Sequence, residues 1–169
     1  MIKITLPDGS VKEFAANSTP IDVAKSISEG LARNVISANF NGTTVETTTP
    51  LTTDGSLVLY TFNDAGGKKA FWHSSAHVLA EAILSFHPNA KLTIGPAIDN
   101  GFYYDLDLGD ETISEKDFAA IEKKFLEIAR GKHEFKMREV SKADALDLYK
   151  KENNPYKVEL IENLTDGDI

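Results

Sequence analysis

The sequence contains no cysteine, so neither disulfides nor thiolate metal sites are possible, and any soft-ligand chemistry falls to its four histidines. It also has no apolar run approaching the roughly 20 residues that a membrane-spanning helix needs. The first ten residues, MIKITLPDGS, have the pattern of a strand and a turn rather than of a signal peptide. We therefore expect a cytoplasmic protein with no membrane association.

Basic residues are scarce, because 18 Lys and Arg stand against 26 Asp and Glu, for a formal net charge of -8. This balance argues against a protein that coats nucleic acid through its overall charge, so any RNA contact must be local. The densest basic stretch comprises Arg130, Lys132, Lys136 and Arg138, of which the last three would share one face of a strand. Such a face fits either a solvated surface or a phosphate contact.

Residues 1–62 alternate between strand patterns and turn signals around one amphipathic helix. Pro7-Asp8-Gly9-Ser10 and Asn41-Gly42 have strong turn chemistry, and Pro20 suits a first helical position. The predicted elements are strands at 2–6 and 11–15, a helix from Thr19 to about Gly30 with a stripe of Ile21, Ala24, Ile27 and Leu31, and strands at 35–40, 43–46 and 57–62. The order is β-β-α-β-β-β.

Residues 63–69 (NDAGGKK) interrupt this periodicity, and the adjacent glycines Gly66 and Gly67 favour an irregular segment. We therefore expect two domains, at 1–62 and 71–169, joined by a linker at 63–70.

The second domain mixes helix and strand patterns, which makes the whole chain α+β. A helical stripe of Trp72, Ala76, Leu79, Ile83 and Phe86 opens it, and a capping box at Ser114 and Asp117 begins a further helix that Gly131 can end. The predicted elements are helices at 72–86, 114–131 and 141–149, and strands at 92–98, 102–108, 133–140 and 156–161.

His73 and His77 lie four residues apart at the start of the first of these helices, so their side chains share one face. A pair of neutral imidazoles can hold or deprotonate a water molecule. The alternative is two partly buried polar residues that flank the core. A zinc site would need three or four ligands, and only Glu81 continues the same face, so we predict no metal site.

The string WHSSAHVLAEAI, followed by KLTIGPAIDNGFYYDLDL, resembles the opening of the editing domain of threonyl-tRNA synthetases, which has distant relatives in alanyl-tRNA editing proteins. Residues 1–62, with LPDGS and the Asn-Gly hairpin, are similar to the ubiquitin-like β-grasp (TGS) module that precedes this domain. The resemblance implies an N-terminal fragment of such a synthetase, in which the editing domain is truncated at its C-terminal end.

The resemblance also implies roles for particular residues. His73 and His77 match the first half of the editing motif, which a later Cys and a third His complete. Lys157 matches a pocket lysine in a Tyr-Lys-Val strand and joins them as a catalytic candidate. Tyr104 matches a substrate-binding tyrosine, although a core role fits it nearly as well. Gly95 and Pro96 would shape the pocket wall.

The implied function is proofreading, in which water hydrolyses the ester of mischarged seryl-tRNA(Thr). The partners implied are therefore tRNA(Thr) and seryl-tRNA(Thr). No cofactor is expected in this region, because ATP, magnesium and zinc would belong to the missing ligase core. That core would also make the full-length enzyme a homodimer.

Two other functions remain open from the sequence. A β-grasp module of this kind can serve as an RNA-binding or partner-binding regulatory piece. A freestanding alanyl-tRNA editing protein is the second, but the β-grasp module and the absent Cys-containing half oppose it. The reading frame beyond Ile169 would distinguish these functions from the synthetase.

Overall fold

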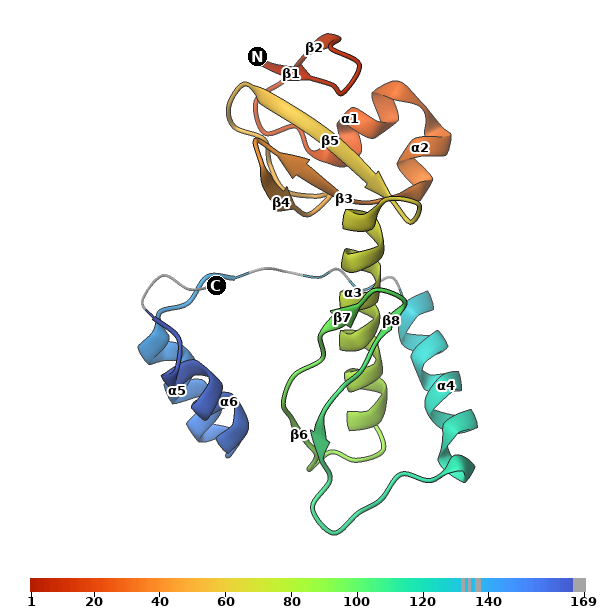
Figure 1. Cartoon of the computed structure of the whole chain (residues 1–169), viewed down its shortest axis with the longest axis vertical. Coiled ribbons are helices and arrows are strands. Elements are labelled where there is room, and N and C mark those ends of the chain that lie inside the picture. The colour runs from red at the N-terminus through yellow and green to blue at the C-terminus, as the bar shows by residue number, and fades with distance from the viewer. Residues whose placement is uncertain (132, 134, 136–137, 166–169) are drawn as a thin grey trace. The chain divides into compact units, whose positions relative to one another are not determined.

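The computed structural model describes residues 1–131, 133, 135 and 138–165 (Figure 1). The chain forms two compact units. The first comprises Met1–His73 with Ala97–Gly101, and the second comprises Ser74–Pro96 with the chain from Phe102 onward. Each unit has its own hydrophobic core.

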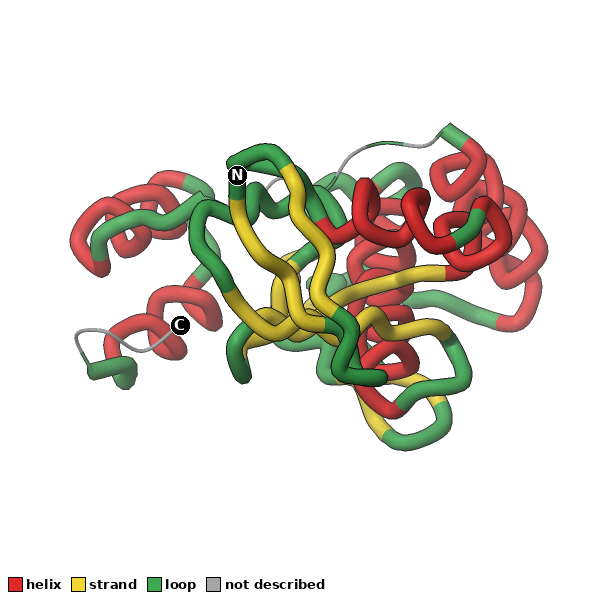
Figure 2. Tube along the Cα trace, turned by 90° about the horizontal axis from the view of Figure 1, so that it is seen from above, coloured by secondary structure: helices red, strands yellow, loops and turns green. Residues whose placement is uncertain are grey.

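The first unit is built on a five-stranded sheet in the order β2-β1-β5-β3-β4. Strands β1 and β5 are parallel, and the other neighbours are antiparallel. Figure 2 shows the strands in yellow and the helices in red. The predicted order of elements is confirmed, with one additional helix, and the sheet has the β-grasp arrangement. The elements are β1 (Ile2–Thr5), β2 (Val11–Phe14), α1 (Pro20–Ile27), α2 (Glu29–Asn34), β3 (Val35–Phe40), β4 (Thr43–Val45) and β5 (Gly55–Thr61).

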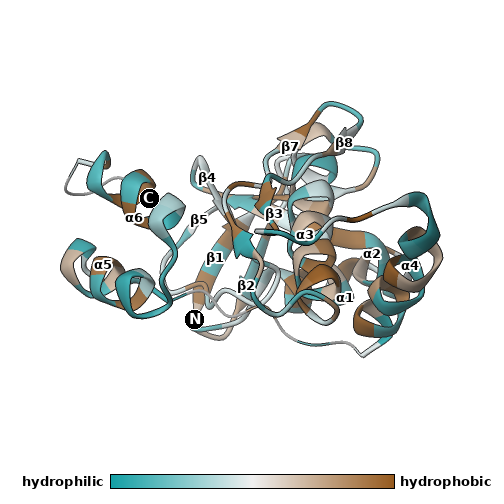
Figure 3. Cartoon of the chain, turned by 90° about the horizontal axis from the view of Figure 1, so that it is seen from below, coloured by the Kyte–Doolittle hydropathy of each residue, from teal (hydrophilic) through white to brown (hydrophobic). Residues whose placement is uncertain are grey.

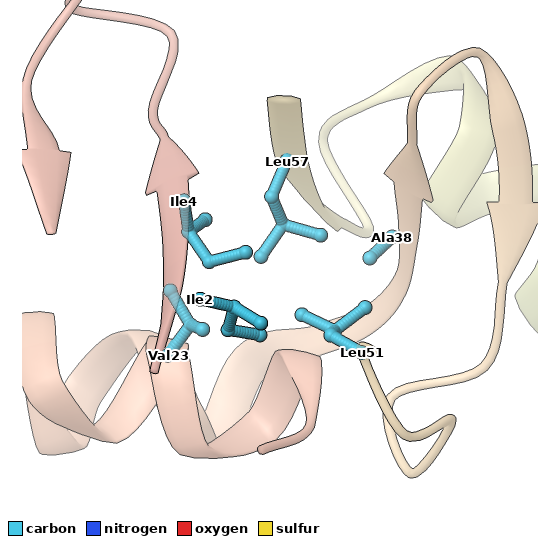
Figure 4. Close-up of a cluster of buried hydrophobic side chains, with 6 residues drawn as sticks. All are labelled: Ile2, Ile4, Val23, Ala38, Leu51 and Leu57. Carbon is cyan, nitrogen blue, oxygen red and sulfur yellow. The ribbon is translucent and has the colours of Figure 1, made fainter. Parts of the chain in front are cut away.

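The core of this unit lies between α1 and the sheet. Thr19 and Asp22 form a capping box at the start of α1, and Pro20 takes a first-turn position as predicted. Figure 4 shows the fully or almost fully buried side chains, which are Ile2, Ile4, Val23, Ala38, Leu51 and Leu57. Alternate residues of β1 enter this core because successive strand side chains point to opposite faces.

Two details of the predicted helix are wrong. Gly30 does not end it, because Ser28 already caps a new helix, α2, by accepting a hydrogen bond from the Leu31 N–H at 3.0 Å. Ile27 is exposed, and Val23 takes the buried position beside Ala24.

Helix α3 (Ala65–Leu84) begins inside the predicted linker. A Cβ at Gly66 would come within 2.6 Å of the Tyr60 ring, and one at Gly67 would overlap the Thr61 carbonyl. The two glycines therefore allow the first turn of α3 to approach the end of β5 closely. The prediction of an irregular segment is wrong for residues 65–69, whereas the division into two domains stays a prediction.

The core of the second unit joins α3 to α4 (Glu115–Arg130). Ala82, Ile83 and Ile121 are buried, and Leu106 and Phe125 are among the side chains that pack against them. Ser114 and Asp117 form the predicted capping box, and Gly131 takes the C-cap position of α4, as predicted. Phe118 is 57% exposed, and Phe86, which the predicted stripe at 72–86 included, is 48% exposed. Figure 3 shows hydrophobic and hydrophilic stretches along α4.

The predicted strands at 92–98 and 102–108 are wrong in length, since this segment contains four strands of two residues each. β6 (Lys91–Leu92) pairs with β9 (Leu106–Asp107), and β7 (Ala97–Ile98) pairs with β8 (Gly101–Phe102). Pro96 has no N–H to donate and interrupts the ladder between the two pairs. A turn at Asp99-Asn100 connects β7 to β8.

The last elements are two short helices, α5 (Lys142–Lys151) and α6 (Pro155–Glu162), which pack against each other. Ser141 caps α5 as predicted. The predicted strand at 156–161 is wrong, because Asn154 caps a helix and Pro155 fills its first position. The predicted strand at 133–140, with Lys132 and Lys136, lies partly outside the described residues, and the described part of it is not a strand.

Within the part of the chain that the structure describes, no helix combines the length and the apolar character needed to cross a bilayer.

Candidate functional site

His73 and His77 both lie in α3, one helical turn apart, so they share one side of the helix. Both side chains are exposed rather than partly buried beside the core. The ring of His77 lies 6.2 Å from that of Phe135, measured between centroids. Because the imidazoles are accessible to solvent, they can bind or deprotonate a water molecule or a polar substrate group.

Gly95 and Tyr104 are brought into direct contact by the pairing of their flanking residues. Thr93 N–H donates to the Asp105 carbonyl at 3.1 Å, and Asp105 N–H donates to the Ile94 carbonyl at 2.9 Å. A Cβ at Gly95 would overlap the ring of Tyr104. The absence of a side chain at this position therefore makes room for the tyrosine.

Tyr104 is neither fully buried nor exposed. Burial raises the pKa of its hydroxyl, and the nearby hydroxyl of Tyr149 on α5 raises this pKa further. The phenol therefore remains a neutral donor and acceptor of hydrogen bonds at physiological pH. Pro96, which follows Gly95, is also half-buried, and its peptide bond is trans.

Lys157 lies in the first turn of α6 and is half-buried. Burial lowers the pKa of its ammonium group, because removal from water disfavours the charged form. The structure therefore places this candidate on a helix, not on the strand that the Tyr-Lys-Val resemblance implied.

Two side chains attach the start of α6 to β6 and β9. Asn154 is 8% exposed, and its Nδ2 donates to the Leu92 carbonyl at 3.0 Å. Tyr156 donates its hydroxyl to a carboxylate oxygen of Asp107 at 2.8 Å. The pKa of Asp107 is lowered by hydrogen bonds from the Gly109 N–H and from Tyr156. Sequence reasoning missed Asn154, although an Asn-Pro pair before a helical pattern is a signal for an N-cap.

Among the described residues, no three His, Cys, Asp or Glu side chains gather in an arrangement that could hold a metal ion. The absence of metal from this chain remains a prediction. An open hollow of about 260 Å³ in the second unit is lined instead by Asn89, Lys91, Asp107, Leu108, Gly109, Asp110 and Glu111.

Comparison with known proteins finds relatives both of the first unit and of the chain as a whole. Residues 2–61 match the family model of the TGS domain. All 169 residues align with a threonine–tRNA ligase of Flavobacterium johnsoniae at 68% identity, with one of Cytophaga hutchinsonii at 50% and with one of Bacteroides thetaiotaomicron at 46%. In each case the alignment covers 100% of this chain and 26% of the relative. Residues 2–61 are therefore a TGS domain, and the whole chain corresponds to about a quarter of the length of threonine–tRNA ligases.

Proposed function

We propose that this chain is the N-terminal region of a threonine–tRNA ligase and that it serves proofreading by hydrolysing mischarged seryl-tRNA(Thr). The observation that carries the proposal is the 68% identity to such a ligase over all 169 residues. The joining of threonine to tRNA(Thr) with ATP is assigned to the remainder of the ligase, which this chain does not span.

The need for a second site follows from the small difference between the two amino acids. Threonine and serine differ by one methyl group, and a single pocket gains only about 1–3 kcal/mol, or roughly 10–200-fold, from such a difference. A separate hydrolytic site can remove serine after it has been attached.

In this proposal His73 and His77 act on the water that attacks the ester. The exposed imidazole of His73 accepts a proton as the water oxygen forms a bond to the ester carbonyl carbon. The bond from that carbon to the terminal ribose oxygen then breaks, and the ribose oxygen takes up a proton. The products are serine and free tRNA. His77, on the same side of α3, supports the orientation of the water or of its partner.

Lys157 contributes a hydrogen-bond donor to the tRNA end or to the oxygen that develops negative charge. Its half-buried position supports this role, since a donor in a less polar surrounding interacts more strongly with developing charge. In this proposal Tyr104 and Gly95, which are in contact, form a wall of the pocket together with Pro96. Tyr104 supplies the surface of this wall that binds the substrate. These residues bind and orient; none requires a cofactor.

We assign ATP, magnesium and zinc to the ligase core outside this chain, and we assign the homodimer contact to the same core. The partner of this region is the acceptor end of tRNA(Thr). A cytoplasmic location agrees with that partner.

The experiment uses the longer ligase that contains this chain, supplied with tRNA(Thr), ATP and serine. The unaltered enzyme should accumulate little seryl-tRNA(Thr), whereas His77→Ala and Lys157→Ala should accumulate it. His133→Ala, which changes another exposed histidine, is the matched control and should behave as the unaltered enzyme. Equal accumulation by all four proteins would contradict the proposal. Unchanged tRNA binding alongside that result would instead favour a binding module.

A further inference from the structure

Asn154 is one of three buried polar residues among those that the structure describes, with Ser37 and Ser75. Its side chain lies between the start of α6 and strand β6. A buried side-chain amide is costly unless both its donor and its acceptor find partners.

Both groups of this amide are used. Oδ1 accepts from the Lys157 N–H at 3.1 Å, which is the usual bond of an N-cap residue. Nδ2 donates to the Leu92 carbonyl at 3.0 Å, across 62 residues of sequence. An N-cap needs only an acceptor, so the second bond serves another purpose: it ties the helix end to a particular point on β6.

That point lies close in sequence to the proposed substrate wall. Leu92 precedes Gly95 by three residues, and Gly95 is in contact with Tyr104. Asn154 therefore joins the backbone of Lys157 directly to the segment that carries the wall. A side chain at position 154 that lacks a donor would still cap α6, but it would not form the hydrogen bond that links α6 to β6.

We propose that Asn154 is a positioning residue for Lys157, holding the first turn of α6 at a fixed place beside the Gly95–Tyr104 wall. This inference rests on the proposed function. Burial lowers the pKa of Lys157, as expected of a side chain that is held in a half-buried position.

The first test needs no catalysis. Asn154→Asp keeps an acceptor for the helix cap and, when ionised, has no donor for the Leu92 carbonyl. Asn154→Ser also keeps the cap acceptor, but its hydroxyl is one bond closer to the backbone than the amide nitrogen and is too short to reach that carbonyl. The acetylation rate of Lys157 by acetic anhydride, followed against pH by peptide mass spectrometry, gives the apparent pKa of its amine. In Asn154→Ser this pKa should rise toward the ordinary lysine value as the side chain becomes solvated.

Ser141→Ala is the matched control, since it uncaps the neighbouring helix α5 without altering the bond between Asn154 and Leu92. It should leave the titration of Lys157 unchanged. Circular dichroism would confirm that the variants stay helical. An unchanged titration of Lys157 in a helical Asn154→Ser protein would overturn the inference.

The second test measures deacylation of seryl-tRNA(Thr) by the longer ligase. Asn154→Ser should lower kcat by on the order of 10- to 100-fold, as expected when a catalytic group is misplaced by about 1 Å, and should leave KM within about twofold. In a Lys157→Ala background the same change should have no further effect. An equal fall in that background would mean that Asn154 acts through general packing, which would overturn the inference.

The two tests separate this inference from the proposed function. If Lys157→Ala leaves deacylation unchanged, the catalytic role of Lys157 is wrong. The titration of Lys157 then still decides whether Asn154 positions it.

Discussion

The ring of Tyr104 lies so close to the backbone of Gly95 that any side chain at position 95 would overlap ring carbons Cδ2 and Cε2. This contact brings together two residues that the sequence assigned to substrate binding. Residues 96–103, which form short strands and irregular chain, separate them in the sequence. Because the ring is held by contact with backbone rather than with another flexible side chain, its orientation is well defined.

Gly95→Ala should therefore displace Tyr104. The expected loss is about 1–3 kcal/mol of unfolding free energy, typical of an extra methyl group in a packed site. Urea denaturation measures the loss. Gly30→Ala is the control, because its nearest neighbour would be Ser28 Oγ at 3.9 Å, and in a helix it should stabilise by about 0.5–1 kcal/mol. A neutral Gly95→Ala would contradict the packing described here.

Gly67→Ala should destabilise the start of α3. Its new methyl group would meet the Thr61 carbonyl, a backbone atom that cannot rotate away. We expect a loss of at least about 1–3 kcal/mol, measured by thermal or urea unfolding and compared with the same Gly30→Ala control. Unaltered stability would mean that Gly66 and Gly67 serve as a flexible joint, as the sequence first suggested.

Stability should fall in acid through the capping carboxylates. The pKa of Asp117 is lowered from 3.8 by hydrogen bonds from the Ser114 N–H and then from its hydroxyl, with a smaller contribution from His87. A depressed folded pKa stabilises the protein above the unfolded pKa, and this contribution is lost as the pH falls through the folded value, below 3.8. Asp117→Asn should therefore flatten the dependence of stability on pH below about 4. If stability falls below about pH 4 as steeply in Asp117→Asn as in the unaltered protein, this prediction is contradicted.

The elements that could be predicted from the sequence are those that neighbouring residues specify. Alternation in residues 2–6, the Asn41-Gly42 turn, the helix start at Thr19 and the capping box at Ser114 predicted elements that the structure confirms. In each of these, the signal and the structure it specifies lie within a few residues of each other.

The errors arose where a residue's role depends on a distant contact. Gly66 and Gly67 have the sequence pattern of a linker. In the structure they belong to α3, where the Thr61 carbonyl leaves no room for a side chain at position 67. Asn154 was missed by sequence reasoning, although it caps α6 and its Nδ2 donates to the Leu92 carbonyl. The contact of Gly95 with Tyr104 likewise had no local signal. Such roles depend on tertiary packing, which periodicity does not record.

The measurement that tests the central claim most directly is the single-turnover rate of seryl-tRNA(Thr) deacylation. It would be compared among the 169-residue chain, the longer ligase and the longer ligase with His73→Ala. The chain alone should be slower by on the order of 100-fold or more, because it contains no cysteine to take the place that the resemblance implies, and an incompletely held ester and water lose about that much. His73→Ala should cause a comparable loss in the longer ligase. Equal rates for the two lengths, or full activity with His73→Ala, would contradict the account.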